Sequence, residues 1–192
     1  MKPLVILDRD GVLNAMVVHP EHGFVDSPLH PDQVEVFPWV PECLSRLTNA
    51  GFELRIATNQ PAAAKGKTTR ENLEATHRKI VEACRARGAV VAQSHICYHR
   101  SEDHCSCRKP QPGLLLDALA DLPEDLRRRS WMVGDGVTDV QAGKAAGVLT
   151  AFLGPKKCDA CKILDDRGLK PDFWGPSLRE LTEYLCRDRP LP

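Results

Sequence analysis

The sequence has few aromatic residues, no excess of either charge and no long apolar run. Phe, Trp and Tyr make up 5% of the 192 residues, and 26 basic residues balance 26 acidic ones. This composition lacks the basic runs with interleaved aromatics that favour nucleic-acid binding. No apolar run approaches the length of a membrane span, and the amino-terminal "MKPLVILDRDG" reaches acidic residues too early for a signal peptide. We therefore expect a cytoplasmic protein that binds a small molecule and has no nucleic-acid or membrane partner.

The chain is long enough for one compact domain, since 42% of its residues are apolar. We expect a single domain over residues 1–192 and a monomer. Eight cysteines are many for a reducing compartment. Cys43, Cys84 and Cys186 lie in helical patterns and are predicted core residues. The other five lie in close pairs or clusters, which favours metal binding over disulfides: Cys97, Cys105, Cys107, Cys158 and Cys161.

Short apolar runs typical of strands alternate with helical patterns along the chain. Strands are predicted over 3–8, 53–59, 89–99, 130–135 and 148–154, and helices over 40–52, 68–88, 112–122 and 137–147. Thr68 or Thr69 is the predicted cap of the second helix, and the tail predicts an aromatic turn followed by a helix capped by Ser177. The alternation predicts an α/β fold, a Rossmann-like three-layer sandwich with a central parallel sheet. Its ligand site is expected at the carboxyl ends of the strands.

Polar side chains stand at that edge after three of the predicted strands. Asp8 and Asp10 follow the first strand, Thr58 and Asn59 end the second, and Asp135 follows the fourth. A further polar residue, the lysine of "CRKPQPG", stands just before a helix start. Each of these pieces alone is typical of a solvated turn or surface residue. Their joint occurrence at strand ends and a helix start predicts one shared site.

Paired carboxylates point to a metal and phosphate site. Asp8 and Asp10 would repel each other unless a cation lay between them, and Mg²⁺ with its oxygen ligands suits that position. Asp8 is the predicted nucleophile that attacks phosphorus, and Asp10 the acid and base that handles protons. Asp135 would complete the magnesium ligands Asp8 and Asp10, with Asp139 orienting it. Thr58, Asn59 and Lys109 would stabilise charge on the phosphoryl oxygens.

The stretch "ICYHRSEDHCSCRKP" carries four metal-ligating side chains. Cys97, His99, Cys105 and Cys107 form the set of a closed tetrahedral structural zinc site, which would stiffen the loop 97–107. The loop continues directly into Arg108 and Lys109. Zinc would thus hold both cations beside the phosphate, and Arg108 is a predicted substrate contact. For Cys158 and Cys161 we expect solvent-facing thiols, with a second zinc ion or a disulfide as alternatives.

The motifs "DRDGVLN", "TNQ", "CRKP" and "GDGVTD" resemble those of the haloacid dehalogenase superfamily of aspartate-based phosphatases. They are most similar to its branch of D-glycero-D-manno-heptose 1,7-bisphosphate phosphatases and histidinol phosphatases, over about residues 4–153. The resemblance implies magnesium dependence, the roles assigned above and a minimal cap in which loops enclose the substrate.

The resemblance implies a phosphatase that acts on a small sugar phosphate through an aspartyl-phosphate, with heptose 1,7-bisphosphate going to the 1-phosphate. Histidinol-phosphate phosphatase is the nearest alternative. The neutral net charge of the chain makes a polynucleotide 3'-phosphatase a weaker alternative. A non-catalytic zinc-stabilised binding module is disfavoured because no motif residue is missing.

Three segments depart from the branch pattern and leave the exact sugar open. The segment of about 15–37 is long, and as a substrate loop it offers His19, His22 and Asp26 as specificity candidates. "PAAAKGK" follows "TNQ" where the branch has a Ser-Gly-Ile-like turn, and Gly136 replaces a common lysine.

Overall fold

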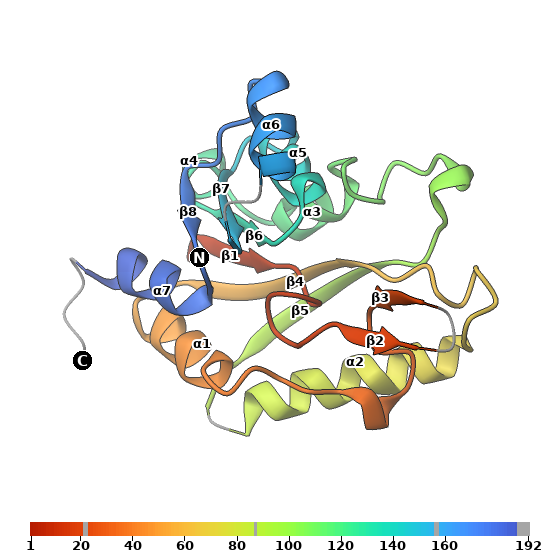
Figure 1. The fold of residues 1–192 in the computed structure, drawn as a ribbon. Helices are drawn as coiled ribbons and strands as arrows, with labels where there is room; N and C mark the ends of the chain where they lie inside the picture. Colours follow the sequence, from red (N-terminus) through yellow and green to blue (C-terminus); the bar gives the residue numbers. More distant parts are fainter. Residues whose placement is uncertain (21–22, 87, 156–157, 188–192) are drawn as a thin grey trace.

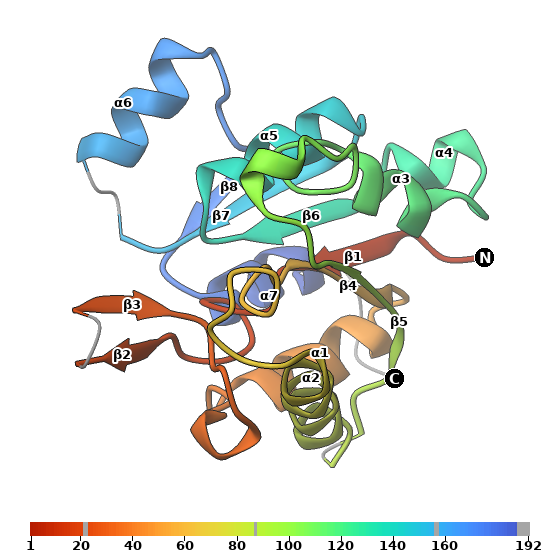
Figure 2. The ribbon, with the colours of Figure 1, turned by 90° about the vertical axis from the view of Figure 1, so that its right-hand side faces the viewer.

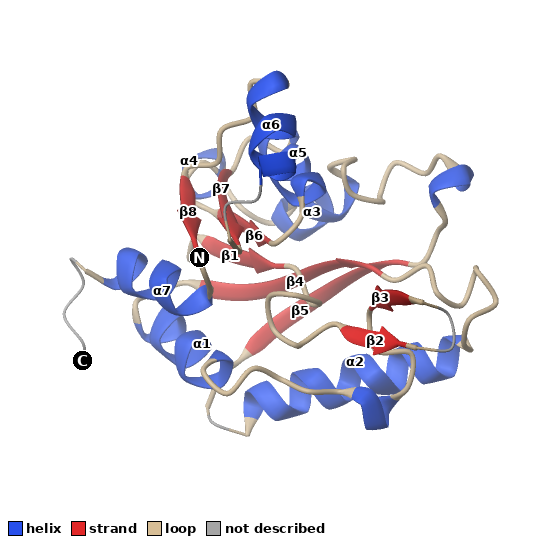
Figure 3. Cartoon of the chain, viewed as in Figure 1, coloured by secondary structure: helices blue, strands red, loops and turns tan. Residues whose placement is uncertain are grey.

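A parallel sheet of six strands forms the centre of the fold (Figure 1, Figure 3). The computed structural model describes residues 1–20, 23–86, 88–155 and 158–187, without the side chains of 158–161. The strands stand in the order β5-β4-β1-β6-β7-β8, and each neighbouring pair is parallel. Their bounds are β1 Leu4–Leu7, β4 Glu53–Asn59, β5 Val91–Cys97, β6 Trp131–Gly134, β7 Leu149–Leu153 and β8 Phe173–Gly175. The predicted α/β fold is confirmed.

The sheet grows in two directions from its first strand. After β1 the chain adds β4 and β5 on one side, then returns to add β6, β7 and β8 on the other. Loops that leave the strands at such a reversal diverge, and a crevice opens at the carboxyl ends. Because β1 lies at the reversal between β4 and β6, the residues that follow these three strands share that crevice.

Helices cover both faces of the sheet (Figure 1, Figure 2). One face carries α1 (Val40–Asn49), α2 (Arg70–Arg85) and α7 (Leu178–Cys186), and the other carries α3 (Gly113–Leu119), α4 (Glu124–Arg127) and α5 (Val137–Ala145). A further helix, α6 (Cys158–Asp166), packs against α5. Short 3-10 turns lie at Pro31–Gln33 and Ser101–Asp103. No helix in the described part of the chain has the length and apolar character to span a bilayer.

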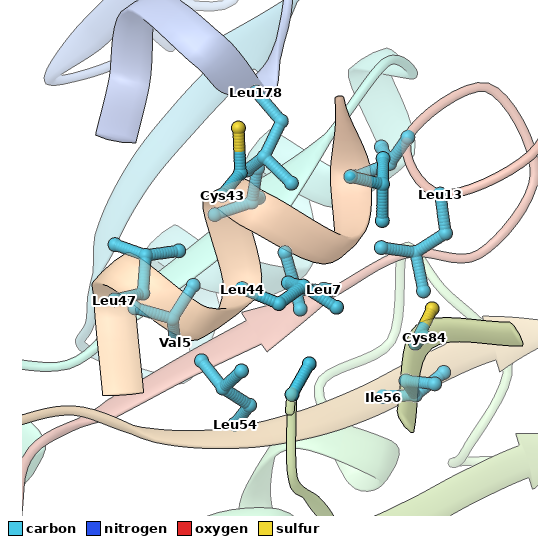
Figure 4. Close-up of a cluster of buried hydrophobic side chains, with 14 of the residues drawn as sticks. Val5, Leu7, Leu13, Cys43, Leu44, Leu47, Leu54, Ile56, Cys84 and Leu178 are labelled. Carbon is cyan, nitrogen blue, oxygen red and sulfur yellow. The ribbon is translucent and has the colours of Figure 1, made fainter. Parts of the chain in front are cut away.

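Strand β1 contacts both layers because its side chains alternate between the two faces. Val5 and Leu7 pack into the core under α1, α2 and α7, as Figure 4 shows, whereas Leu4 and Ile6 pack under α3 and α5. A strand buried on both faces reads as a continuous apolar run, which is the pattern seen in the sequence. Cys43 and Cys84 are buried in the first of these cores and Cys186 packs against it, as predicted.

Both predicted helix caps are present. Thr69 Oγ1 accepts a hydrogen bond from the Asn72 main-chain N–H at 3.2 Å, and Ser177 Oγ accepts one from Arg179 at 3.2 Å. These bonds satisfy amide groups that have no partner within the helix.

Two predictions about local structure were wrong. The predicted aromatic turn contains strand β8, which pairs with β7 at the sheet edge. The segment predicted as a loop over 15–37 contains an antiparallel hairpin of β2 (Val17–His19) and β3 (Phe24–Asp26). Each of these strands has three residues. That is too short for an alternating pattern, so pairing with a neighbour determines the structure instead.

Neighbouring leucines of α3 provide a test of this packing. Leu115 is fully buried, whereas Leu116 is 47% exposed. We expect Leu115→Ala to lower the free energy of unfolding by about 2–5 kcal/mol because it leaves a cavity. Leu116→Ala, the matched control, should change it by less than about 1 kcal/mol. Urea denaturation measures both, and equal losses would contradict the assigned helix face.

Candidate active site

The strand ends bring the predicted site residues together in one small pocket. It has a volume of about 170 Å³ and lies where β1, β4 and β6 end. Its lining residues come from these strand ends and from the hairpin segment: Asp8, Asp10, Met16, Asp26, Ser27, Thr58, Asn59 and Asp135. Figure 2 shows the hairpin on the side of the molecule toward which β1 points. The hairpin segment thus forms the wall opposite the strand ends.

Lys109 lies buried against Asp8, one of the residues that line this pocket. Its Nζ contacts Asp8 Oδ2 at 3.0 Å and Asp139 Oδ1 at 2.6 Å, and it donates to the main-chain oxygen of Ala57 at 2.8 Å. Burial alone would lower the pKa of Lys109, but the carboxylates of Asp139 and Asp8 outweigh burial and raise it. The site therefore keeps a permanent cation against Asp8.

Three carboxylates form a cluster around that cation. Oxygen atoms of Asp8, Asp135 and Asp139 all lie within 4.8 Å of one another. Burial raises the pKa of Asp8 to about 6, with Asp139 and Asp10 adding to the rise and Lys109 opposing it. Burial and the charges of Asp139 and Asp8 raise the pKa of Asp135 to about 7. A divalent cation would remove this repulsion, so the donor set suits a hard metal ion.

Gly11 and Gly134 allow the close approach of these carboxylates. Gly11 has φ +80°, and a Cβ there would lie 2.1 Å from Asp135 Oδ2. A Cβ on Gly134 would lie 2.2 Å from Asp139 Oδ2. Only glycine leaves room for both side chains, and Asp139 Oδ2 also accepts a hydrogen bond from the Gly136 N–H at 3.0 Å.

The Asp10 carboxylate is held apart from this cluster by four hydrogen bonds. Oδ1 accepts from Arg9 Nε at 3.1 Å and from Asn14 Nδ2 at 2.9 Å. Oδ2 accepts from Arg9 Nη2 at 2.9 Å and from Gln60 Nε2 at 2.6 Å. All four partners donate, which is the arrangement that an ionised carboxylate accepts. Asp10 nevertheless lines the pocket and faces the same space as Asp8.

Thr58 and Asn59 have different surroundings at the end of β4. Thr58 is 1% exposed, and its Oγ1 accepts a hydrogen bond from Gln60 Nε2 at 3.1 Å. Asn59 forms a reciprocal pair with the Lys109 main chain, because its Nδ2 donates to the Lys109 oxygen at 3.0 Å and its Oδ1 accepts from the Lys109 N–H at 3.1 Å. Asn59 thereby ties the chain at Lys109 to the end of β4.

The four predicted zinc ligands form a second cluster, with Cys97 at the end of β5 and the other three on the loop that follows. Their ligand atoms lie within 4.8 Å of one another. Cys107 Sγ is 3.4 Å from Cys97 Sγ and from Cys105 Sγ, and 3.3 Å from His99 Nδ1. Cys97 Sγ is 3.8 Å from Cys105 Sγ and 3.5 Å from His99 Nδ1. Sulfur ligands about 2.3 Å from a tetrahedral zinc ion stand about 3.8 Å apart. The cluster therefore fits a zinc ion.

Arg108 faces a second, larger pocket beside this loop. Its Nη1 donates to the main-chain oxygen of His99 at 3.2 Å. The pocket has a volume of about 520 Å³ and is lined by Arg100, Ser101, His104, Cys105, Ser106, Arg108, Lys109, Pro110, Gln111 and Thr138. The metal-ligating loop thus presents cationic side chains at the surface next to Lys109.

The hairpin is attached to the segment that follows β4. Lys67 Nζ contacts Asp26 Oδ2 at 2.7 Å and lies 3.9 Å from the centre of the Phe24 ring. Burial would raise the pKa of Asp26, but hydrogen bonds from Lys67 and Ser27 lower it. Lys67 therefore holds a carboxylate at the rim of the pocket. His19 is buried against Phe24 rather than in the pocket, and His22 lies outside the described residues.

Known phosphatases resemble this chain in sequence, in agreement with the geometry of the site. A family model described as HAD-hydrolase-like matches residues 106–181. A D-glycero-beta-D-manno-heptose-1,7-bisphosphate 7-phosphatase of Neisseria meningitidis is 34% identical over 197 aligned residues, which cover 98% of this chain and 97% of that protein. The chain belongs to this phosphatase family.

Solved structures of the heptose bisphosphatase family share its fold. The crystal structure of D,D-heptose 1,7-bisphosphate phosphatase from B. bronchiseptica, complexed with magnesium and phosphate, has a TM-score of 0.79 and 32% identity, covering 98% of this chain and 99% of that one. The structure from Burkholderia thailandensis has a TM-score of 0.62 and 26% identity, covering 94% and 96%. This family member therefore shares its fold with a phosphatase whose crystal structure contains magnesium and phosphate.

Sequence reasoning missed the residues that hold the site of this family member in place. Arg9 lies between the two aspartates and Gln60 ends the "TNQ" motif, yet neither was singled out. Alternation along an extended strand would place Arg9 on the face opposite Asp8 and Asp10, so the pattern carried no signal for its contact with Asp10. Lys67 gave no signal either, because its partner Asp26 is 41 residues away.

The crowded carboxylates predict how stability depends on pH without magnesium. Asp135 has a pKa of about 7 in the folded chain, against an ordinary value of 3.8. At a pH between these two values, Asp135 is therefore protonated in the folded chain and ionised in the unfolded chain. The contribution of Asp135 to the free energy of unfolding should therefore fall as the pH rises from 4 to 7. Denaturation in magnesium-free buffer should show that the free energy of unfolding falls more steeply with rising pH in the wild type than in Asp135→Asn.

Two controls accompany this measurement. The exposed change Asp125→Asn on α4 should leave the wild-type pH dependence intact. Added Mg²⁺ should stabilise the wild type most above pH 7, because the metal binds ionised carboxylates. Parallel pH curves for the wild type and Asp135→Asn would contradict the raised pKa.

Proposed function

We propose that this chain is a magnesium-dependent phosphatase that converts a D-glycero-D-manno-heptose 1,7-bisphosphate to the 1-phosphate. The observation that carries the proposal is the position of Asp8, whose carboxylate lies 3.0 Å from the buried Lys109 in a pocket shared with Thr58 and Asp135. Membership of the heptose bisphosphatase family supports the choice of substrate.

Asp8 is the proposed nucleophile. Its carboxylate oxygen attacks the phosphorus of the 7-phosphate and forms an aspartyl-phosphate, while the bond from phosphorus to the sugar oxygen breaks. Asp10 gives a proton to that oxygen, so the sugar leaves as an alcohol. Asp10 then takes a proton from the water that attacks the aspartyl-phosphate, and inorganic phosphate and free Asp8 result. The hydrogen bonds from Arg9 and Gln60 hold the Asp10 carboxylate in place for both proton transfers.

Lys109 and Thr58 stabilise the phosphoryl group as it moves. Charge spreads over the three outer oxygens in a loose transition state, so a buried cation and a hydroxyl donor at fixed positions lower the barrier. Asn59 acts through its two bonds to the Lys109 main chain and also borders the pocket, where its predicted contact with the phosphate stays a proposal.

The proposed magnesium ligands are Asp8, Asp10 and Asp135, as the sequence predicts. Oxygen atoms of Asp8 and Asp135 lie within 4.8 Å of each other, and burial together with neighbouring carboxylates raises both pKa values, a cost that a bound cation would remove. When bound, the ion would screen the charge of the incoming phosphate. Asp139 would keep Lys109 in place through their 2.6 Å contact.

The proposed zinc site uses Cys97, His99, Cys105 and Cys107. Cys105 Sγ also accepts a hydrogen bond from the Arg108 N–H at 3.4 Å, so the residue before Lys109 is tied to a ligand. A bound ion would stiffen the loop 97–107. We propose that Arg108 contacts the second phosphate of the substrate, and that the hairpin with Asp26 contacts the sugar.

Phosphate release from a panel of substrates tests the function. We expect heptose 1,7-bisphosphate to exceed histidinol phosphate and a 3'-phosphorylated oligonucleotide at least tenfold in kcat/KM, about 1.4 kcal/mol in transition-state binding. Asp8→Asn should lower kcat on the order of a thousandfold or more, because the nucleophile is lost. Asp125→Asn should keep full activity. The substrate assignment fails if histidinol phosphate is hydrolysed faster.

Metal analysis tests the zinc site. We expect one zinc ion per wild-type chain and none in Cys107→Ser, because a closed tetrahedral site needs all four ligands. Cys107→Ser should also melt at a lower temperature and lose kcat/KM, since the loop before Lys109 is no longer held. Cys186→Ser, which lies in α7 away from the cluster, should retain the ion. Equal zinc content in Cys107→Ser and Cys186→Ser would contradict the proposed zinc site.

A further inference from the structure

We propose that Gln60 is a positioning residue that aims Asp10 and Thr58 at the substrate. The inference rests on the proposed function, in which Asp10 protonates the leaving sugar oxygen and Thr58 holds the phosphoryl group. Gln60 itself is 1% exposed and does not line the pocket. It therefore acts through its neighbours.

A single amide group of Gln60 joins three functional side chains. Its Nε2 donates to Asp10 Oδ2 at 2.6 Å and to Thr58 Oγ1 at 3.1 Å. Its Oε1 accepts from Arg9 Nη2 at 2.7 Å. These three bonds use both donor hydrogens and one acceptor position of the amide, so its orientation is fixed from both ends.

Arg9 completes the network around Asp10. Its side chain is fully buried and grips both oxygens of Asp10, through Nε at 3.1 Å and Nη2 at 2.9 Å. Nη2 also bonds to Gln60 Oε1, so Arg9, Gln60 and Asp10 form a closed ring of hydrogen bonds. A ring of this kind restricts rotation of the Asp10 carboxylate more than any one of its bonds would, because each member holds the next.

The bond to Thr58 determines which atom its hydroxyl can offer. A threonine hydroxyl has one hydrogen to donate and lone pairs to accept with. Because Thr58 Oγ1 accepts from Gln60, its own hydrogen stays available for a phosphoryl oxygen. Gln60 thus prepares Thr58 as a donor and Asp10 as a proton carrier, both of which line the same pocket.

The main chain of Gln60 links this network to the zinc loop. Its N–H donates to the main-chain oxygen of Cys97 at 2.6 Å, and Cys97 is one of the proposed zinc ligands. Gln60 therefore stands on backbone that is held by the end of β5. A positioning residue needs such support, because an error of about 1 Å in the placed group lowers the rate strongly.

The test compares two substrates that differ in their need for a proton. The sugar oxygen of heptose 1,7-bisphosphate is a poor leaving group and needs Asp10, whereas 4-nitrophenolate leaves without protonation. The measured quantity is kcat/KM, which reports on the steps up to formation of the aspartyl-phosphate. Gln60→Met keeps the length of the side chain and removes all three bonds. Gln93→Met, at an exposed position of β5, is the matched control.

We expect Gln60→Met to lower kcat/KM about a hundredfold for heptose 1,7-bisphosphate and less than about tenfold for 4-nitrophenyl phosphate. Thermal melting of Gln60→Met and Gln93→Met will establish that each variant is folded. Gln60→Asn retains the amide on a shorter side chain and serves as a second variant if Gln60→Met fails to fold. It should show the same substrate dependence, because its amide falls short of Asp10.

Each outcome decides one question. A loss at least ten times larger for the sugar substrate supports the role of Gln60 in positioning Asp10. Similar losses for both substrates, or no loss, overturn it, since a merely structural residue would not distinguish leaving groups. If the wild type hydrolyses neither substrate, the proposed function itself is wrong.

Discussion

The carboxylates of Asp8, Asp135 and Asp139 meet at one edge of the sheet, and their mutual repulsion is offset by Lys109. The buried ammonium lies 3.0 Å from Asp8 and 2.6 Å from Asp139, and the pKa values of Asp8 and Asp135 remain raised despite it. The charge balance is therefore incomplete without a divalent ion. This need explains why glycines crowd the same edge, since a larger residue would push the carboxylates apart.

Support for that edge comes from the segment that carries the predicted zinc ligands. The cysteine and histidine cluster begins at the last residue of β5 and leads directly into Arg108 and Lys109. The pair of hydrogen bonds between Asn59 and the Lys109 main chain ties the same segment to β4. The main chain at Lys109 is thus fixed both by Asn59 at the end of β4 and by the hydrogen bond from Arg108 to Cys105. The proposed zinc ion would add four bonds to the packing of the three cysteine ligands against the core under α3.

The sequence predicted the main parts of both the fold and the site because their signals are local. Buried strands appear as apolar runs, and Asp8, Asp10, Thr58 and Asp135 stand at strand ends, which topology brings together. The hairpin and β8 could not be predicted, because three-residue strands take their structure from neighbours. The contacts of Arg9 and Gln60 depend on side-chain directions across strands, and no spacing reveals them. Cys158 and Cys161 lie at the start of α6, where the side chains are outside the described residues.

The hairpin over the pocket belongs to a sheet of its own. Its two strands pair with each other and not with the central sheet, and the ion pair between Asp26 and Lys67 helps to attach it. Substitutions in β2 or β3 can therefore reshape this wall of the pocket without disturbing the backbone hydrogen bonds of the strand that precedes Asp8. The proposed sugar contacts and the proposed nucleophile therefore lie on separately hydrogen-bonded parts of the backbone, so substitutions can change the former and leave the latter in place.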